Sequence, residues 1–101
     1  MRIFISQPTR GKTYEQILEE RKAIEIKITS DFGNNVEFIN SLFSGESNPL
    51  RSLSRALSIL ADADAAIFIG EWYLYPGCSI EHQCCVNYGI PILKEYKEVN
   101  T

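Results

Sequence analysis

Glu81 is the residue of this sequence best placed to do chemistry. It comes four residues after Gly77, where the spacing of apolar residues predicts a helix over residues 79–88. A carboxylate in the first turn of a helix is stabilised by the helix dipole, so Glu81 is expected to stay ionised. An ionised, positioned carboxylate can attack a sugar carbon, as in retaining glycoside hydrolysis. Acidic residues also stand at helix starts for stability alone, so the position allows either role.

A basic turn at residues 7–12 could hold an anion. Pro8 and Gly11 prevent this segment from continuing as a strand or a helix. Arg10 and the backbone amides around Gly11 would lie beside the N-terminus of the next helix, an arrangement that attracts small anions. A solvated basic turn without a ligand is the alternative. The segment departs from the phosphate-binding loop of nucleoside triphosphatases, because Ser6 stands where that loop needs a glycine.

Cysteine, histidine and aromatic residues surround Glu81 in the sequence. Cys84 and Cys85 are neighbours on a predicted helix and point about 100° apart, so they do not suit one metal ion. We therefore expect no metal and no other cofactor. Trp72, Tyr73 and Tyr75 could stack on a base, close a pocket or pack against another subunit.

The composition predicts one small globular domain, residues 1–101, and excludes several classes of protein. A chain of 101 residues is long enough for one core and too short for two. A net charge of −3 without a basic stripe argues against a nucleic-acid polymer as partner. No apolar run is long enough to cross a membrane, and three cysteines without a disulfide spacing are typical of a reducing compartment. We therefore expect a cytoplasmic protein without a membrane partner.

Strand and helix patterns alternate along the whole chain. Apolar runs predict strands at residues 3–5, 36–40, 65–70 and 90–93, followed by a charged tail at residues 94–101. Thr13 and Gln16 form a capping-box pattern at the start of a first helix that Gly33 would end. Helical spacing predicts two more helices at residues 50–61 and 79–88.

This alternation predicts an α/β fold. We expect a single-domain, flavodoxin- or Rossmann-like three-layer sandwich, with a parallel sheet of about four strands in the order 2-1-3-4 and helices on both faces. In such sheets, ligands bind beyond the carboxyl ends of the strands where the strand order reverses. Here the reversal lies between the first and third strands, so the loops at residues 7–12 and 71–78 should meet there.

Four segments carry a pattern that matches a known superfamily: IFISQPTRGK (3–12), LADADA (60–65), GCSIEH (77–82) and YGIP (88–91). They span nearly the whole chain, and in this order they resemble the nucleoside 2-deoxyribosyltransferase-like superfamily, in particular its short phage and bacterial branch. The resemblance implies that Glu81 attacks the anomeric carbon of a nucleoside or nucleotide. It also implies a homodimer or larger homo-oligomer. With the two loops, the predicted ligand contacts are Ser6, Gln7, Pro8, Arg10, Gly11, Trp72, Gly77, Cys78 and Ser79.

Two positions differ from the pattern of the superfamily. Active members often carry an aspartate in the helix before the third strand, where it helps to protonate the leaving base, whereas residues 54–57 here contain no carboxylate. Tyr75 stands where a polar residue often meets the sugar or the phosphate. Asp62 or Asp64, later on the same helix, could substitute for the missing acid.

Three functions are compatible with these residues. The first is an enzyme that cleaves or transfers the N-glycosidic bond of a (deoxy)nucleoside or nucleotide, with Glu81 as the nucleophile. The second is a non-catalytic binder that sequesters or senses a nucleotide in the same pocket, as in phage counter-defence. The third is an interaction protein whose aromatic loop meets a partner. The presence of Glu81 in its expected setting favours the enzyme.

Overall fold

Four parallel strands form the centre of the computed structural model, which describes residues 1–42 and 47–98. Their order is β2-β1-β3-β4, so the predicted topology is confirmed. β1 and β3 are the two central strands, and Ser6 at the end of β1 pairs with Phe68 of β3. The strands are β1 (Arg2–Ser6), β2 (Glu37–Phe38), β3 (Ala65–Ile69) and β4 (Ile92–Tyr96).

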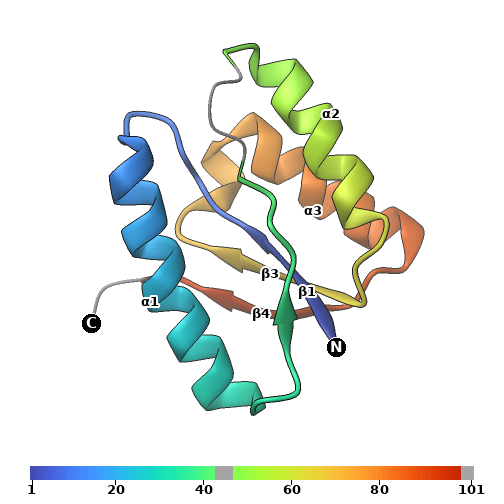
Figure 1. The fold of residues 1–101 in the computed structure, drawn as a ribbon. Coiled ribbons are helices and arrows are strands. Elements are labelled where there is room, and N and C mark those ends of the chain that lie inside the picture. The colour runs from blue at the N-terminus through green and yellow to red at the C-terminus, as the bar shows by residue number, and fades with distance from the viewer. Residues whose placement is uncertain (43–46, 99–101) are drawn as a thin grey trace.

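Helices cover both faces of this sheet, as predicted. The helices are α1 (Tyr14–Phe32), α2 (Pro49–Leu60) and α3 (Pro76–Tyr88). Because successive strand residues point to opposite faces, Ile3, Ile5, Ile67 and Ile69 pack against α1, whereas Phe4, Ala66 and Phe68 pack against α2 and α3. In Figure 1, α2 and α3 lie together above the strands and α1 lies to their lower left. None of the helices in the described parts of the chain is long and apolar enough to cross a membrane.

The ends of α1 follow from local sequence signals. The Thr13 hydroxyl accepts a hydrogen bond from the Gln16 backbone N–H, and the Gln16 side chain accepts one from the Thr13 N–H, so the predicted capping box is present. Gly33 ends the helix with a φ of +89°, and its N–H donates to the Thr29 carbonyl oxygen. Both predicted boundaries of this helix are confirmed.

The two outer strands differ from their predicted boundaries. β2 is limited to Glu37–Phe38, shorter than the predicted residues 36–40, because it lies at the edge and pairs only with the first residues of β1. β4 spans Ile92–Tyr96, so residues 94–96 of the predicted tail belong to the sheet and pair with β3. β4 is an edge strand with exposed Lys94 and Glu95, and its polar face hides the strand pattern in the sequence.

The third helix begins earlier than predicted. Its first residue is Pro76 rather than Ser79, because proline suits the first helical position, where its missing N–H has no acceptor to lose. A short 3₁₀ helix, η1 (Trp72–Leu74), precedes it. Glu81 consequently lies in the second turn of α3, and the first turn contains no acidic residue.

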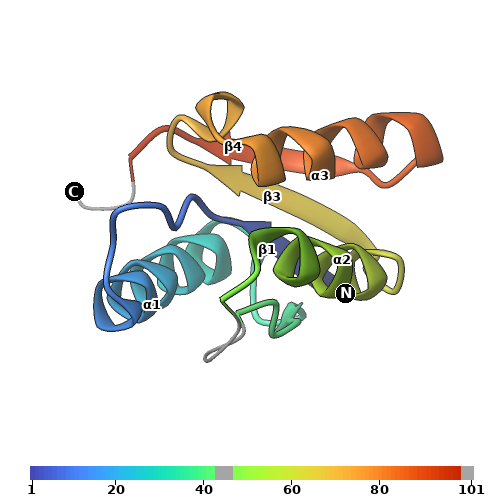
Figure 2. The same cartoon turned by 90° about the horizontal axis from the view of Figure 1, so that it is seen from above.

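The segments that follow β1 and β3 leave the sheet at the same end, which both views show (Figures 1 and 2). Gly70 turns the chain away from β3 with a φ of +66°, a conformation that favours glycine. A Cβ atom at Gly70 would lie 3.7 Å from Cγ of Pro8, so the two segments are in contact range. The predicted meeting of the two loops at this end of the sheet is therefore confirmed.

Candidate functional site

A cavity of about 650 Å³ lies where these segments meet. Its described walls include the turn at residues 7–10, the inner face of α1, the first half of α2, residues 75–78 and residues 80–81. We call it the main cavity. A volume of this size falls within the roughly 300–1,000 Å³ that is typical of small-molecule sites.

Glu81 is a buried carboxylate in the wall of the main cavity, with 8% of its surface exposed. Ser6, the last residue of β1, donates a hydrogen bond from Oγ to Glu81 Oε1 over 2.6 Å. No described residue donates to Oε2. Because no fully buried side-chain oxygen among the described residues lacks a hydrogen-bond partner, Oε2 must be accessible to solvent. One oxygen is therefore held in place by Ser6, and the other is open to solvent.

The charge state of Glu81 differs from the prediction. Burial raises its pKa to about 7, against the opposing effects of the Ser6 hydrogen bond and the positive charge of Arg21. The helix dipole acts mainly within the first turn, and Glu81 lies in the second. Glu81 is therefore partly protonated at neutral pH, and the expectation of a fully ionised carboxylate was wrong.

Arg21 is a functional candidate that the sequence analysis missed. It lies on α1 with 6% of its surface exposed and lines the main cavity. Its Nε donates to Gln7 Oε1 over 3.0 Å, and its Nη2 donates to Ser41 Oγ over 3.3 Å and to the Ile5 carbonyl oxygen over 3.4 Å. Burial lowers its pKa to about 10, so it stays protonated at neutral pH.

A signal for Arg21 was present in the sequence. The buried positions of α1 are Ile17, Arg21, Ile24 and Ile28, which follow helical spacing along one face. A charged residue in such an apolar stripe indicates a buried, paired charge. The surrounding run of charged residues, EERK, concealed it.

The turn after β1 contributes some of its predicted residues to the main cavity. Pro8 and Gln7 are buried in its wall, and the Gln7 amide donates to the Ile17 carbonyl oxygen over 3.0 Å. Arg10 is exposed at the edge of the cavity, whereas Gly11 lies outside its lining. The backbone N–H groups of residues 9–11 donate to no acceptor in the described parts of the chain, so they stay free for an anion.

The predicted residues around α3 divide between two faces. Gly77 and Cys78 line the main cavity, and burial raises the pKa of the Cys78 thiol to about 11, so it is neutral. The Ser79 hydroxyl instead donates to the Tyr73 carbonyl oxygen over 3.2 Å, outside the cavity. Trp72 also lies outside: its ring stacks on His82 at 4.0 Å.

Asp62 and Asp64 lie at the opposite end of the sheet from Glu81. The Asp64 carboxylate accepts a hydrogen bond from the backbone N–H of Arg2 over 2.7 Å, and the Asp62 carbonyl oxygen accepts one from the Arg2 side chain. Arg2 is the first residue of β1, whereas Ser6 and Glu81 meet at its last residue. The expectation that Asp62 or Asp64 could replace the missing acid is therefore wrong, and Glu81 is the one carboxylate among the described residues of the main cavity.

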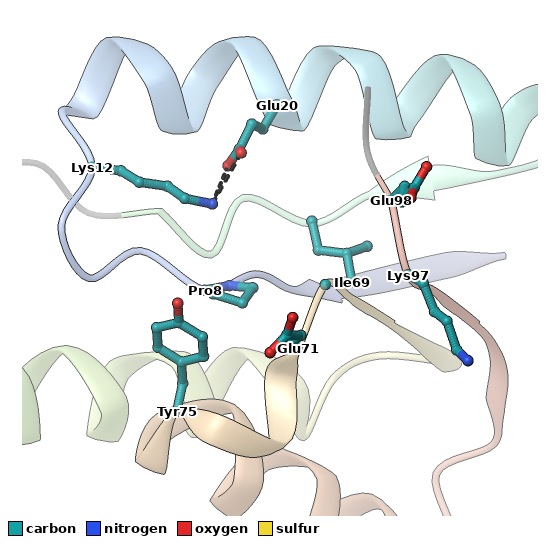
Figure 3. Close-up of a pocket in the computed structure, with 9 residues that line it drawn as sticks. Pro8, Lys12, Glu20, Ile69, Glu71, Tyr75, Lys97 and Glu98 are labelled. Carbon is teal, nitrogen blue, oxygen red and sulfur yellow. Dashed lines mark hydrogen bonds and ion pairs between the residues drawn. The ribbon is translucent and has the colours of Figure 1, made fainter. Parts of the chain in front are cut away.

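A second cavity of about 450 Å³ adjoins the main cavity and shares Pro8 and Tyr75 with it. Figure 3 shows the Tyr75 hydroxyl directed toward Pro8, and Lys12 paired with Glu20 on α1. Lys12 Nζ lies 2.9 Å from Glu20 Oε1, so this lysine is already neutralised by a carboxylate. The described lining of the second cavity is Pro8, Lys12, Glu20, Ile69, Gly70, Glu71, Tyr75, Lys97 and Glu98.

The cysteines and the histidine near Glu81 do not converge on one point. Cys85 is buried in the core with Phe68 and Leu60, and His82 stacks on Trp72. In residues 1–42 and 47–98, no group of three or more histidine, cysteine or acidic side chains could hold a metal ion.

No protein-family model matches the chain, and no curated protein and no solved structure matches it either. The function must therefore be inferred from the main cavity itself. Its distinguishing features are a buried carboxylate with one oxygen hydrogen-bonded to Ser6, a buried arginine, and an exposed basic turn at the edge.

Proposed function

We propose that this protein cleaves or transfers the N-glycosidic bond of a (deoxy)nucleoside or nucleotide, with Glu81 as the nucleophile. One observation carries the proposal: a buried carboxylate, fixed through one oxygen by Ser6 at 2.6 Å, offers its second oxygen to a cavity at the strand carboxyl ends. The resemblance of residues 3–12 and 77–82 to the nucleoside 2-deoxyribosyltransferase-like superfamily supports the same chemistry.

In the proposed reaction, ionised Glu81 forms a bond from Oε2 to the anomeric carbon as the bond to the base nitrogen breaks. The resulting glycosyl ester is then opened by water, which gives hydrolysis, or by a second base, which gives transfer. Ser6 orients the carboxylate through Oε1. Because no second carboxylate among the described residues lines the cavity, the leaving base takes its proton from water or from a hydroxyl group such as that of Tyr75.

The experiment incubates the purified protein with a panel of deoxynucleosides, deoxynucleotides and signalling nucleotides, and separates the products by chromatography. Free base should appear, and Glu81→Gln should lower its release by about 10⁴-fold, because a nucleophile has been removed. Glu71→Gln in the second cavity is the matched control and should leave release unchanged. Equal release by the wild type and Glu81→Gln would exclude Glu81 as nucleophile.

A non-catalytic nucleotide binder is the second candidate, as in sequestration of a signalling nucleotide during phage counter-defence. The observation that favours it is the lack of a second carboxylate in the described lining, which leaves the leaving base without a strong acid. In the same experiment, a binder would carry intact ligand through chromatography and release no base. Its affinity for that ligand would persist in Glu81→Gln.

A cytoplasmic homodimer or larger homo-oligomer completes the proposal. Leu74, Val86 and Tyr88 leave 60% or more of their surfaces exposed along η1 and α3, as an interface with a second copy would require. Light scattering during size-exclusion chromatography measures the assembly directly. A monomer at all concentrations would contradict this part of the proposal.

A further inference from the structure

The charged side chains of the main cavity have an excess of positive charge. Its described lining holds two arginines, Arg10 and Arg21, against one carboxylate, Glu81. The described lining is therefore positive by one charge even when Glu81 is ionised, although the whole chain carries a net charge of −3. A cleft lined mainly by one sign of charge concentrates ligands of the opposite sign. The main cavity thus favours an anionic ligand.

The Arg21 guanidinium has one edge that contacts no hydrogen-bond acceptor in the described parts of the chain. Nε and Nη2 donate to Gln7, Ser41 and the Ile5 carbonyl oxygen, whereas Nη1 donates to no described residue. No fully buried side-chain nitrogen among the described residues lacks a partner, so Nη1 must be accessible to solvent. Since Arg21 is 94% buried and lines the main cavity, this edge is available to a ligand there.

The other basic residues near the main cavity are less suited to hold an anion. Lys12 is paired with Glu20 and lines the second cavity rather than the main one. Arg10 is exposed at the edge, where water screens its charge. Arg21 is held in one orientation by three acceptors, and a planar, fixed guanidinium matches the oxygen geometry of a phosphate.

We propose that Arg21 binds the phosphate group of a nucleoside monophosphate inside the main cavity and makes the protein prefer nucleotides to nucleosides. The inference rests on the proposed nucleotide pocket but needs no catalysis. Arg10 and the free amides of residues 9 and 10 attract the same anion at the edge of the cavity. Arg21 supplies the fixed, buried contact.

Isothermal titration calorimetry in the Glu81→Gln background tests this inference without turnover. The probes are dAMP, dCMP, dGMP and TMP, each compared with its own nucleoside. At least one monophosphate should bind about 10- to 100-fold more tightly than its nucleoside, as expected for hydrogen bonds to a charged group. Adding Arg21→Gln should abolish this preference while nucleoside affinity stays within about 3-fold.

Two further arginine variants complete the comparison. Arg51→Gln, on the exposed start of α2 and outside the cavity lining, should leave the preference unchanged. Arg10→Gln should lower it by only about 2- to 3-fold, an effect that high salt removes. A preference that survives Arg21→Gln, or equal losses for nucleotides and nucleosides, would overturn the inference.

A measurement on the protein with Arg21 intact guards against misfolding of the Arg21→Gln variant. The ¹⁵Nε resonance of Arg21 should shift when the preferred monophosphate is added and stay in place with its nucleoside. An unchanged resonance at saturating monophosphate would also overturn the inference. Failure of the wild type to release base would instead contradict the proposed reaction and leave the binding result standing.

Discussion

The main cavity and the second cavity share Pro8 and Tyr75 in their walls, but their charged groups differ. In the second cavity, Lys12 and Glu20 form a partly exposed ion pair at 2.9 Å, and the described lining holds three carboxylates and two lysines. In the main cavity, Glu81 and Arg21 are each more than 90% buried, and they form no direct ion pair. The two sites therefore differ in burial and pairing more than in residue type.

This difference has a chemical consequence. Burial shifts the pKa of Glu81 upward to about 7 and that of Arg21 downward to about 10, so both groups are driven toward their neutral forms. Strongly shifted ionisable groups in a cleft mark functional sites more often than exposed ion pairs do. The main cavity is therefore the site that we propose for the reaction, and the second cavity serves as its matched reference.

Apart from the loss of base release in Glu81→Gln, the largest expected effect is on the free energy of unfolding. Because the pKa of Glu81 is about 7 in the folded chain and about 4.5 when exposed, the unfolded chain ionises first as the pH rises. Protonated Glu81 therefore favours the folded chain. Its contribution to the free energy of unfolding is complete below about pH 4.5 and is lost as the pH rises through 7. The free energy of unfolding of Glu81→Gln should therefore exceed that of the wild type by about 3 kcal/mol at pH 8. At pH 4.5 the two values should be nearly equal. Urea titrations at both pH values measure this.

Glu71→Gln is the control for this stability prediction. Glu71 lines the second cavity and is exposed, so its substitution should change the free energy of unfolding little at either pH. Equal responses of the two glutamine variants to pH would show that Glu81 is not buried as the structure indicates.

A smaller effect is expected for Ser6→Ala. The substitution removes the hydrogen bond from Ser6 to the Glu81 carboxylate, and a hydrogen bond to a charged group contributes roughly 1.5–3 kcal/mol. We therefore expect kcat/KM for base release to fall by about 10- to 100-fold. The Ser6 hydrogen bond lowers the pKa of Glu81, so without it the pKa rises. Since the nucleophile must be ionised, the acidic limb of the pH profile, expected near pH 7 in the wild type, should move to higher pH.

Ser58→Ala, exposed on α2, provides the control for Ser6→Ala. Its pH profile should match that of the wild type. If Ser6→Ala lowered activity without moving the acidic limb, the hydrogen bond to Glu81 would not be the reason for the loss.

The smallest effect is expected in the second cavity. Lys12→Ala removes a partly exposed ion pair, which contributes about 0.2–1 kcal/mol to the free energy of unfolding. Binding and base release should stay within about 2-fold of the wild type, because Lys12 lies outside the lining of the main cavity. A loss of 10-fold or more in either measurement would show that the second cavity takes part in the reaction.

Much of the fold was predictable because its signals are local. The capping residues Thr13 and Gln16, the stop at Gly33 and the apolar run of β3 each act within a few residues. Strand order then followed from right-handed crossovers. The edge strand β4 was misplaced because its exposed polar face lacks an apolar signal.

The candidate site was only partly predictable. Ser6 stood out at the end of a predicted strand and Glu81 near the start of a predicted helix, and the structure brings them together. Trp72 was expected to contact a ligand but stacks on His82, since the 3₁₀ helix turns its ring toward α3. Arg21 was missed because its neighbours in the sequence are also charged.

The sequence by itself determined which segments become strands and helices, where most helices begin and end, and which end of the sheet holds the site. These properties depend on spacing and on backbone conformation, which neighbouring residues fix. Only the tertiary structure decided the charge state of Glu81 and the burial of Arg21. Both properties depend on burial and on hydrogen-bond partners that come from distant parts of the sequence, such as Ser6 for Glu81 and Gln7 for Arg21. A local sequence pattern does not encode this desolvation.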